Sequence, residues 1–360
     1  MPQTSLETTD STTDTRVRRA ALWGLVFGSG VNVWGLQWDI KWHVLVGRDS
    51  FWIPPHLMTY SGVTLCVLLS YGILARDTLR ARRGLSLPRG ARYIAGLAGS
   101  RGFLLAAAGI TLTVLAAPID EMWHRLVGLD PTVWSPPHLM GIAGCALNTL
   151  ACLTIGREVY GPESRARVVV IVLAGAILYD WLHFVLDPTI ELGRLRGGLA
   201  FQSYAMLASL LMPLALVPAA TLSARRGASF YVPALVIVFV TVGNAIARLG
   251  FHLIQPLSAG ALAIERDNWM LARPGSVLLD FIALLPAAAM AFTDARRRPV
   301  VATVAYGAVL FVVLGAVLRR LPSFQPVIPG TAVTAAALVL TLVLAGIGGW
   351  MARGLARALD

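Results

Sequence analysis

Two stretches of the chain, about eighty residues apart, carry the same acidic and imidazole side chains at nearly the same spacing. In the first stretch Asp39 precedes His43 by four residues, and His56 follows thirteen residues later. The second stretch keeps this order with one additional residue between the histidines, at Asp120, His124 and His138. Both copies have a tryptophan before the first histidine, a glycine four residues after it, and Pro-Pro-His-Leu-Met around the second. The chain therefore contains an internal repeat whose shared residues are possible metal ligands.

The spacing within each copy predicts a helical hairpin. An Asp and a His at positions i and i+4 project from the same face of a helix, and Gly47 or Gly128 then marks the helix end. The two prolines suit the first turn of the next helix. The tip of such a hairpin brings together two imidazoles and one carboxylate, a ligand set that suits copper, zinc or iron. The alternative is a structural polar network at the helix ends, but the retention of all three residues in two copies favours a metal.

The first copy resembles a copper site of a known protein family. The run Asp39-x3-His43-x12-His56, with Arg48 and Asp49 after the first histidine, resembles the C subunit of the copper membrane monooxygenases, the particulate methane and ammonia monooxygenases. The resemblance implies that these three residues bind copper. A second site of that family, an Asn and two His, corresponds by its spacing to Asp120, His124 and His138, with Asp in place of Asn. The resemblance covers roughly residues 35–145.

The composition is that of an integral membrane protein. Hydrophobic residues make up 56% of the chain and charged residues 14%, with a mean hydropathy of +0.69. Residues 1–16 are polar and rich in Thr, so we expect a disordered cytoplasmic tail and not a cleaved signal peptide.

Apolar runs long enough to cross a bilayer predict an all-α polytopic membrane protein with about ten transmembrane helices. We expect these helices at residues 18–46, 55–76, 101–127, 137–156, 167–187, 199–222, 230–254, 274–294, 300–318 and 331–350. Residues 17–160 would then form a four-helix region with the duplicated motif, and residues 161–360 a six-helix membrane region.

Arginines concentrate in every second connection between the predicted helices. By the positive-inside rule, both termini are then cytoplasmic and the metal motifs face the extracytoplasmic side. The resemblance implies that this membrane is a bacterial inner membrane. The formal charge of +11 comes from these short connections, with no basic face interleaved with aromatic residues. We therefore expect the lipid bilayer as a partner, and no nucleic acid.

Polar side chains inside the later apolar helices form a possible secondary site, because such groups must face the bundle interior or water. In a structural interpretation, Asp180 and His183 form a polar helix end, and Arg248 and Asp280 form an ion pair. In a functional interpretation, the polar residues of the later helix line a path for protons or substrate. The residues of this possible site are Asp180, His183, Asn244, Arg248, His252 and Asp280.

The repeat and the resemblance together favour a copper-binding membrane subunit of a monooxygenase-like complex. One or two coppers per chain would activate oxygen to hydroxylate a small substrate, and zinc or iron is the less favoured metal. Three protein ligands leave a coordination position open, as a catalytic metal requires. Such an oxidoreductase also needs sister membrane subunits and an electron donor.

Two other functions stay open. A metal-ion transporter or metal-handling protein suits the helix count and the paired hairpins, although carriers of soft Cu(I) use Met and Cys, and only Met58 and Met140 lie beside the motifs. A haem-binding membrane electron carrier would use paired histidines but would leave Asp39 and Asp120 without a role.

Overall fold

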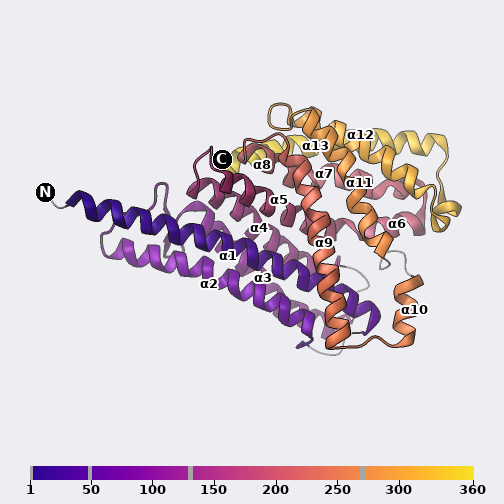
Figure 1. Ribbon diagram of the computed structural model, residues 1–360. Helices are drawn as coiled ribbons and strands as arrows, with labels where there is room; N and C mark the ends of the chain where they lie inside the picture. The colour runs from indigo at the N-terminus through magenta and orange to yellow at the C-terminus, as the bar shows by residue number, and fades with distance from the viewer. Residues whose placement is uncertain (1–2, 48–50, 129–132, 268–272) are drawn as a thin grey trace.

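The regular secondary structure of the described residues is helical except for one small hairpin, which confirms the prediction of an all-α fold (Figure 1). A computed structural model describes residues 3–47, 51–128, 133–267 and 273–360, with the side chains of residues 3–12, 267 and 273–280 outside the description. The helices are α1 (Gln3–Leu45), α2 (Pro54–Arg82), α3 (Arg101–Leu126), α4 (Pro136–Val159), α5 (Arg165–Leu186), α6 (Pro188–Arg196), α7 (Ser203–Leu211), α8 (Pro213–Leu222), α9 (Ala228–Leu253), α10 (Ala259–Asp267), α11 (Arg273–Phe292), α12 (Pro299–Leu318) and α13 (Thr331–Leu359). Short 3-10 helices η1 (Gly198–Gln202) and η2 (Pro322–Val327) complete the helical elements.

Eight helical segments in the described residues are long and apolar enough to cross a membrane, which indicates an integral membrane protein. They lie at eight of the ten predicted positions. The predicted span at residues 18–46 is helical but is not among the eight, because polar residues such as Asn32 and Gln37 interrupt its apolar sequence. In α11 only Phe281–Phe292 counts as a shorter apolar helix, because the side chains before it lie outside the description. The total of ten stays a prediction.

Helices that follow each other in the sequence pack against each other in both the N-terminal and the C-terminal part of the chain. The helix α1 packs along α2, and α3 packs along α4, while α12 contacts both α11 and α13. Figure 1 shows α1 and α2 along one edge and α12 and α13 along the opposite one. Large apolar side chains of α9 and α13, including Val238, Val339 and Trp350, are exposed, as contact with lipid tails requires.

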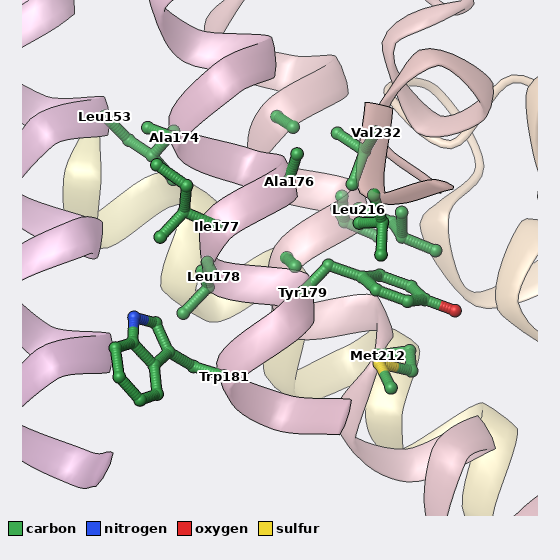
Figure 2. Packing of buried hydrophobic residues seen from close by; sticks show 14 of the residues in the cluster. Leu153, Ala174, Ala176, Ile177, Leu178, Tyr179, Trp181, Met212, Leu216 and Val232 are labelled. Carbon is green, nitrogen blue, oxygen red and sulfur yellow. The ribbon is translucent and has the colours of Figure 1, made fainter. Parts of the chain in front are cut away.

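The core centres on α5, which contacts α1, α4, α7, α8 and α9. Figure 2 shows Tyr179 of this helix beside Leu216 and Met212, while Trp181 points to the opposite side of the helix. The hydroxyl groups of Tyr179 and Tyr306 lie 3.3 Å apart and satisfy each other in this buried environment.

In each motif hairpin the two helices cross at a pair of glycines, and the two pairs occupy equivalent positions in the repeat. A Cβ on Gly62 of α2 would lie 2.5 Å from the carbonyl oxygen of Gly28, and a Cβ on Gly144 of α4 would lie 2.7 Å from that of Gly109. In each pair, one glycine lies eleven residues before the motif aspartate, and the other lies six residues after the second histidine. The repeat therefore extends beyond the motif into the helix crossing that sets the distance between its two arms.

A two-stranded antiparallel hairpin, β1 (Arg92–Ile94) and β2 (Leu97–Gly99), occupies the connection between α2 and α3. Ala95 and Gly96 both have positive φ, 51° and 79°, as the tightest two-residue turns need. The sequence predicts only a basic loop here, since the strands are three residues each.

The prediction of a disordered tail over residues 1–16 differs from the structure, in which α1 begins at Gln3. The side chains give a physical reason for the last turns of this segment. Asp14 accepts a hydrogen bond from Arg18 at 2.8 Å and pairs with Arg76 of α2. Arg18 in turn lies 2.5 Å from the fully buried Asp77. This ion-pair network ties α1, before its apolar part begins, to α2, after its apolar part ends.

Candidate metal centres

Both copies of the motif form the predicted helical hairpins. In the first copy α1 ends at Leu45, Gly47 has a φ of +95°, and Pro54 opens α2. The second copy has the same geometry, with a φ of +101° at Gly128 and Pro136 opening α4. Positive φ at these positions reverses the chain after the helix, which glycine does without steric cost. Residues 48–50 and 129–132 of the two tips, including Arg48, Asp49 and Leu129, lie outside the described residues.

The hairpins bring the three predicted ligands of each copy together. In site 1, Oδ1 of Asp39 lies 3.4 Å from Nδ1 of His43 and 3.1 Å from Nε2 of His56. One ligand atom from each residue lies within 4.8 Å of the other two.

Site 2 repeats this geometry between α3 and α4. Oδ1 of Asp120 lies 3.4 Å from Nε2 of His124 and 3.2 Å from Nε2 of His138. Its three ligand atoms also fall within 4.8 Å of one another. All six predicted ligands thus lie in two compact clusters, each bridging the two arms of one hairpin.

Each cluster contains a carboxylate oxygen that has no hydrogen bond to a described residue. Within the described part of the chain, Oδ1 of Asp39 and Oδ1 of Asp120 are buried and have no hydrogen-bond partner. Each of these oxygens nevertheless faces two imidazole nitrogens. A buried anionic oxygen is costly unless a cation or donor compensates it. A transition-metal ion would meet that need, and the oxygen and nitrogen donors fit such an ion.

A carbonyl of the connecting loop orients one histidine in each site. In site 1, Nδ1 of His56 lies 3.1 Å from the carbonyl oxygen of Phe51, and in site 2, Nδ1 of His124 lies 3.0 Å from that of Gly128. An imidazole that donates from Nδ1 keeps Nε2 unprotonated and turned toward the cluster, which is the usual arrangement for a metal-binding histidine.

Aromatic side chains lie beside site 1. The hydroxyl of Tyr60 donates to the Phe51 carbonyl at 3.3 Å, and its ring lies 5.8 Å from that of His56. Trp52 and Phe51 extend this group toward the surface. At the position equivalent to Tyr60, four residues after the second histidine, site 2 has Ile142.

The possible secondary site is divided among separate contacts in the described residues. Asp180 is buried and accepts a hydrogen bond from Gln37 of α1 at 3.0 Å. His183 contacts the hydroxyl of Tyr204 through Nδ1 at 2.8 Å. In the described residues, no hydrogen bond or ion pair joins these two side chains to the polar stripe of α9, which consists of Asn244, Arg248 and His252.

The α9 stripe itself is divided. Asn244 accepts a hydrogen bond from Lys41 of α1 at 2.5 Å. Arg248 and His252 instead line a cavity together with Glu265 of α10. The predicted ion pair between Arg248 and Asp280 stays a prediction, because the Asp280 side chain lies outside the described residues.

Sequence reasoning missed the residues that support the clusters. Tyr60 lies one helical turn after His56 and was detectable from that spacing. Gln37 and Lys41 lie close to Asp39 in sequence, but their partners, Asp180 and Asn244, are more than 140 residues away. Contacts of this kind carry no local sequence signal.

Comparisons with protein-family models, with curated proteins and with solved structures found no significant match to this chain.

Proposed function

We propose that this chain is an integral membrane metalloprotein that binds one transition-metal ion at site 1 and a second at site 2. Copper is the preferred metal, since the ligand set suits it and the sequence of site 1 resembles a copper site of the membrane monooxygenases. The observation that carries the proposal is the convergence, twice in one chain, of two imidazoles on a buried carboxylate oxygen that lacks a hydrogen bond.

We further propose that the chain acts as a subunit of a monooxygenase-like complex. Copper bound by three protein ligands would supply the activation of dioxygen, and the substrate would be a small molecule that is hydroxylated. The chain's own residues hold the metal and fix the imidazole tautomers through the Phe51 and Gly128 carbonyls. Sister membrane subunits and an electron donor would complete the complex.

The geometry argues against a haem at either site. A haem between His43 and His56 would need the porphyrin plane to pass between the two rings. Oδ1 of Asp39 lies within 3.4 Å of both imidazoles, in the region that this plane would occupy. Site 2 has the same obstruction at Asp120.

Metal transport is a second candidate, which the burial of the Asp180 carboxylate inside α5 favours. A carboxylate buried in a membrane helix is a frequent element of ion pathways, and Asp180 is 1% exposed. Uptake of copper or zinc into proteoliposomes that contain the purified chain would support transport. Stable, stoichiometric binding without uptake would support the enzyme subunit.

Metal analysis of the detergent-purified protein tests the proposal. We expect about two metal equivalents in the wild type if both sites are filled, and the loss of one equivalent in each of the variants His43→Ala/His56→Ala and His124→Ala/His138→Ala, because an isolated Asp does not hold a transition metal tightly. The matched control is His183→Ala/His252→Ala, which removes two histidines outside the clusters. Equal metal content in all four proteins would refute both sites.

A further inference from the structure

A cavity of about 410 Å³ lies between the end of α9 and the short helix α10. Its walls include Arg248, Phe251, His252, Leu257, Leu262 and Glu265. This volume falls within the range of small-molecule sites in proteins. None of these residues belongs to site 1 or site 2.

The charged groups that line the described part of the cavity have opposite signs and come from two different helices. Arg248 and His252 lie one helical turn apart on α9 and therefore share a face. Glu265 comes from α10. Such a cavity matches a ligand with an anionic and a cationic group, because a simple anion would face Glu265 and a simple cation would face Arg248.

Exposed apolar side chains adjoin the cavity. Leu249, Leu253 and Ile254 of the same stretch are each more than half exposed, as is Leu262 in the cavity wall. Arg248 lies in the last turns of α9, one of the eight helices suited to cross a membrane. At the end of a membrane span, an apolar surface beside a charged cavity fits a lipid, with its headgroup in the cavity and its acyl chains along the helix.

Packing against α1 fixes the wall that α9 contributes. The ring of Phe251 stacks on Trp42 with centroids 6.1 Å apart and meets Trp38 edge-on at 6.3 Å. Ala261 of α10 is buried in the same apolar cluster. The hydrogen bond from Lys41 to Asn244 joins α1 to α9 one turn before Arg248. The cavity is therefore part of the packed structure and does not depend on exposed side chains alone.

We propose that this cavity binds the headgroup of a zwitterionic phospholipid that carries a primary ammonium, as in phosphatidylethanolamine. The phosphate accepts hydrogen bonds from the Arg248 guanidinium and from an N–H of His252. The ammonium pairs with the Glu265 carboxylate. This site uses none of the six proposed metal ligands and goes beyond the proposed function.

Lipid binding to the full-length, delipidated protein in detergent tests the proposal, with native mass spectrometry as the readout. We expect the wild type to bind phosphatidylethanolamine more tightly than phosphatidylglycerol, which has no ammonium. Arg248→Gln should weaken both lipids about tenfold, as the loss of a charge-assisted hydrogen bond implies. Glu265→Gln should remove the preference for phosphatidylethanolamine while phosphatidylglycerol still binds.

The matched controls are Arg125→Gln and Glu121→Gln, which remove an exposed ion pair of α3 that lines no part of this cavity. Both should bind the lipids as the wild type does. The preference is a ratio within each protein, so a change in overall stability does not alter it. Equal binding of the two lipids by the wild type, or an unchanged preference in Glu265→Gln, would overturn the proposal. Binding of soluble glycerophosphoethanolamine as tightly as the lipid would overturn its assignment to a lipid.

Discussion

His43 and His124 occupy equivalent positions in the repeat, but their imidazole rings make different contacts. Nδ1 of His124 lies 3.0 Å from the Gly128 carbonyl oxygen, whereas Nδ1 of His43 lies 2.9 Å from the carbonyl oxygen of Asp39. In site 1 the ring held by a carbonyl of the connecting loop is that of His56. The two sites therefore have the same types of ligand, but they differ in which histidine contacts a carbonyl of the connecting loop. We expect them to bind metal with different affinities.

Tyr60→Phe should lower the metal affinity of site 1 by about tenfold, a typical effect for a residue that orients a metal-binding histidine. The substitution keeps the aromatic ring but removes the hydroxyl that donates to the Phe51 carbonyl, the same carbonyl that orients His56. A competition titration with a chelator, in the His124→Ala/His138→Ala background, measures site 1 alone.

The matched control uses the equivalent position of the other hairpin. Ile142→Leu conserves side-chain volume, so it should leave the affinity of site 2 unchanged in the His43→Ala/His56→Ala background. An unaltered affinity in Tyr60→Phe, together with an unaltered electron paramagnetic resonance spectrum of bound Cu(II), would show that the Tyr60 hydroxyl does not position His56.

Gly62→Ala and Gly144→Ala should each destabilise the protein by about 1–3 kcal/mol, the usual cost of overpacking. The added methyl group would lie within 2.7 Å of a backbone carbonyl oxygen on the facing helix. Thermal unfolding in detergent, followed by tryptophan fluorescence, measures the loss. Gly72→Ala is the control in the same helix as Gly62, since a Cβ there meets nothing within 4 Å in the described structure. Equal unfolding temperatures for Gly62→Ala and Gly72→Ala would contradict a close crossing.

Asp180→Asn should leave the stability unchanged or raise it, while Asp180→Ala should lower it by about 1–3 kcal/mol. The Asn side chain still accepts the hydrogen bond from Gln37 and removes the cost of burying a charge. Ala leaves the Gln37 amide without that acceptor in a buried place. If Asn is as damaging as Ala in thermal unfolding, then the negative charge of Asp180 itself is required.

Asp14 should make the fold sensitive to acid. Burial alone would raise the pKa of Asp14, but hydrogen bonds and charges from Arg18 and Arg76 outweigh burial and leave this pKa below its usual value. The ionised carboxylate therefore contributes stability that is fully present above about pH 4, the range of an unfolded Asp. This contribution is lost as the pH falls through the lower pKa of the folded state. Unfolding temperatures from pH 6 to pH 3 should fall more steeply in the wild type than in Asp14→Asn, and parallel curves would contradict this contribution.

The sequence predicted the local parts of the fold well. Glycine at the helix end and paired prolines at the next helix start are local signals, and the hairpins that carry Asp39 and Asp120 follow them. The ligand sets could be predicted because helical spacing and a tight turn bring i, i+4 and a residue on the next helix together. Apolar run length likewise predicted the positions of the membrane-suited helices.

The parts that could not be predicted depend on contacts between distant segments. The cavity that Arg248 and His252 line depends on the position of α10, which no local pattern indicates. The contact between Gln37 and Asp180 depends on how α1 packs on α5. The start of α1 at Gln3 was also missed, since Arg76, which pairs with Asp14, lies 62 residues away.

The central claim is that each Asp/His/His cluster binds a transition metal through its own three residues. X-ray absorption at the copper edge, on protein loaded with copper and carrying only site 1 or only site 2, tests the ligands directly. We predict a first shell of nitrogen and oxygen alone, with the outer scattering of two imidazoles per copper in each protein. Sulfur in the first shell, or no imidazole scattering, would place the metal elsewhere and contradict both sites.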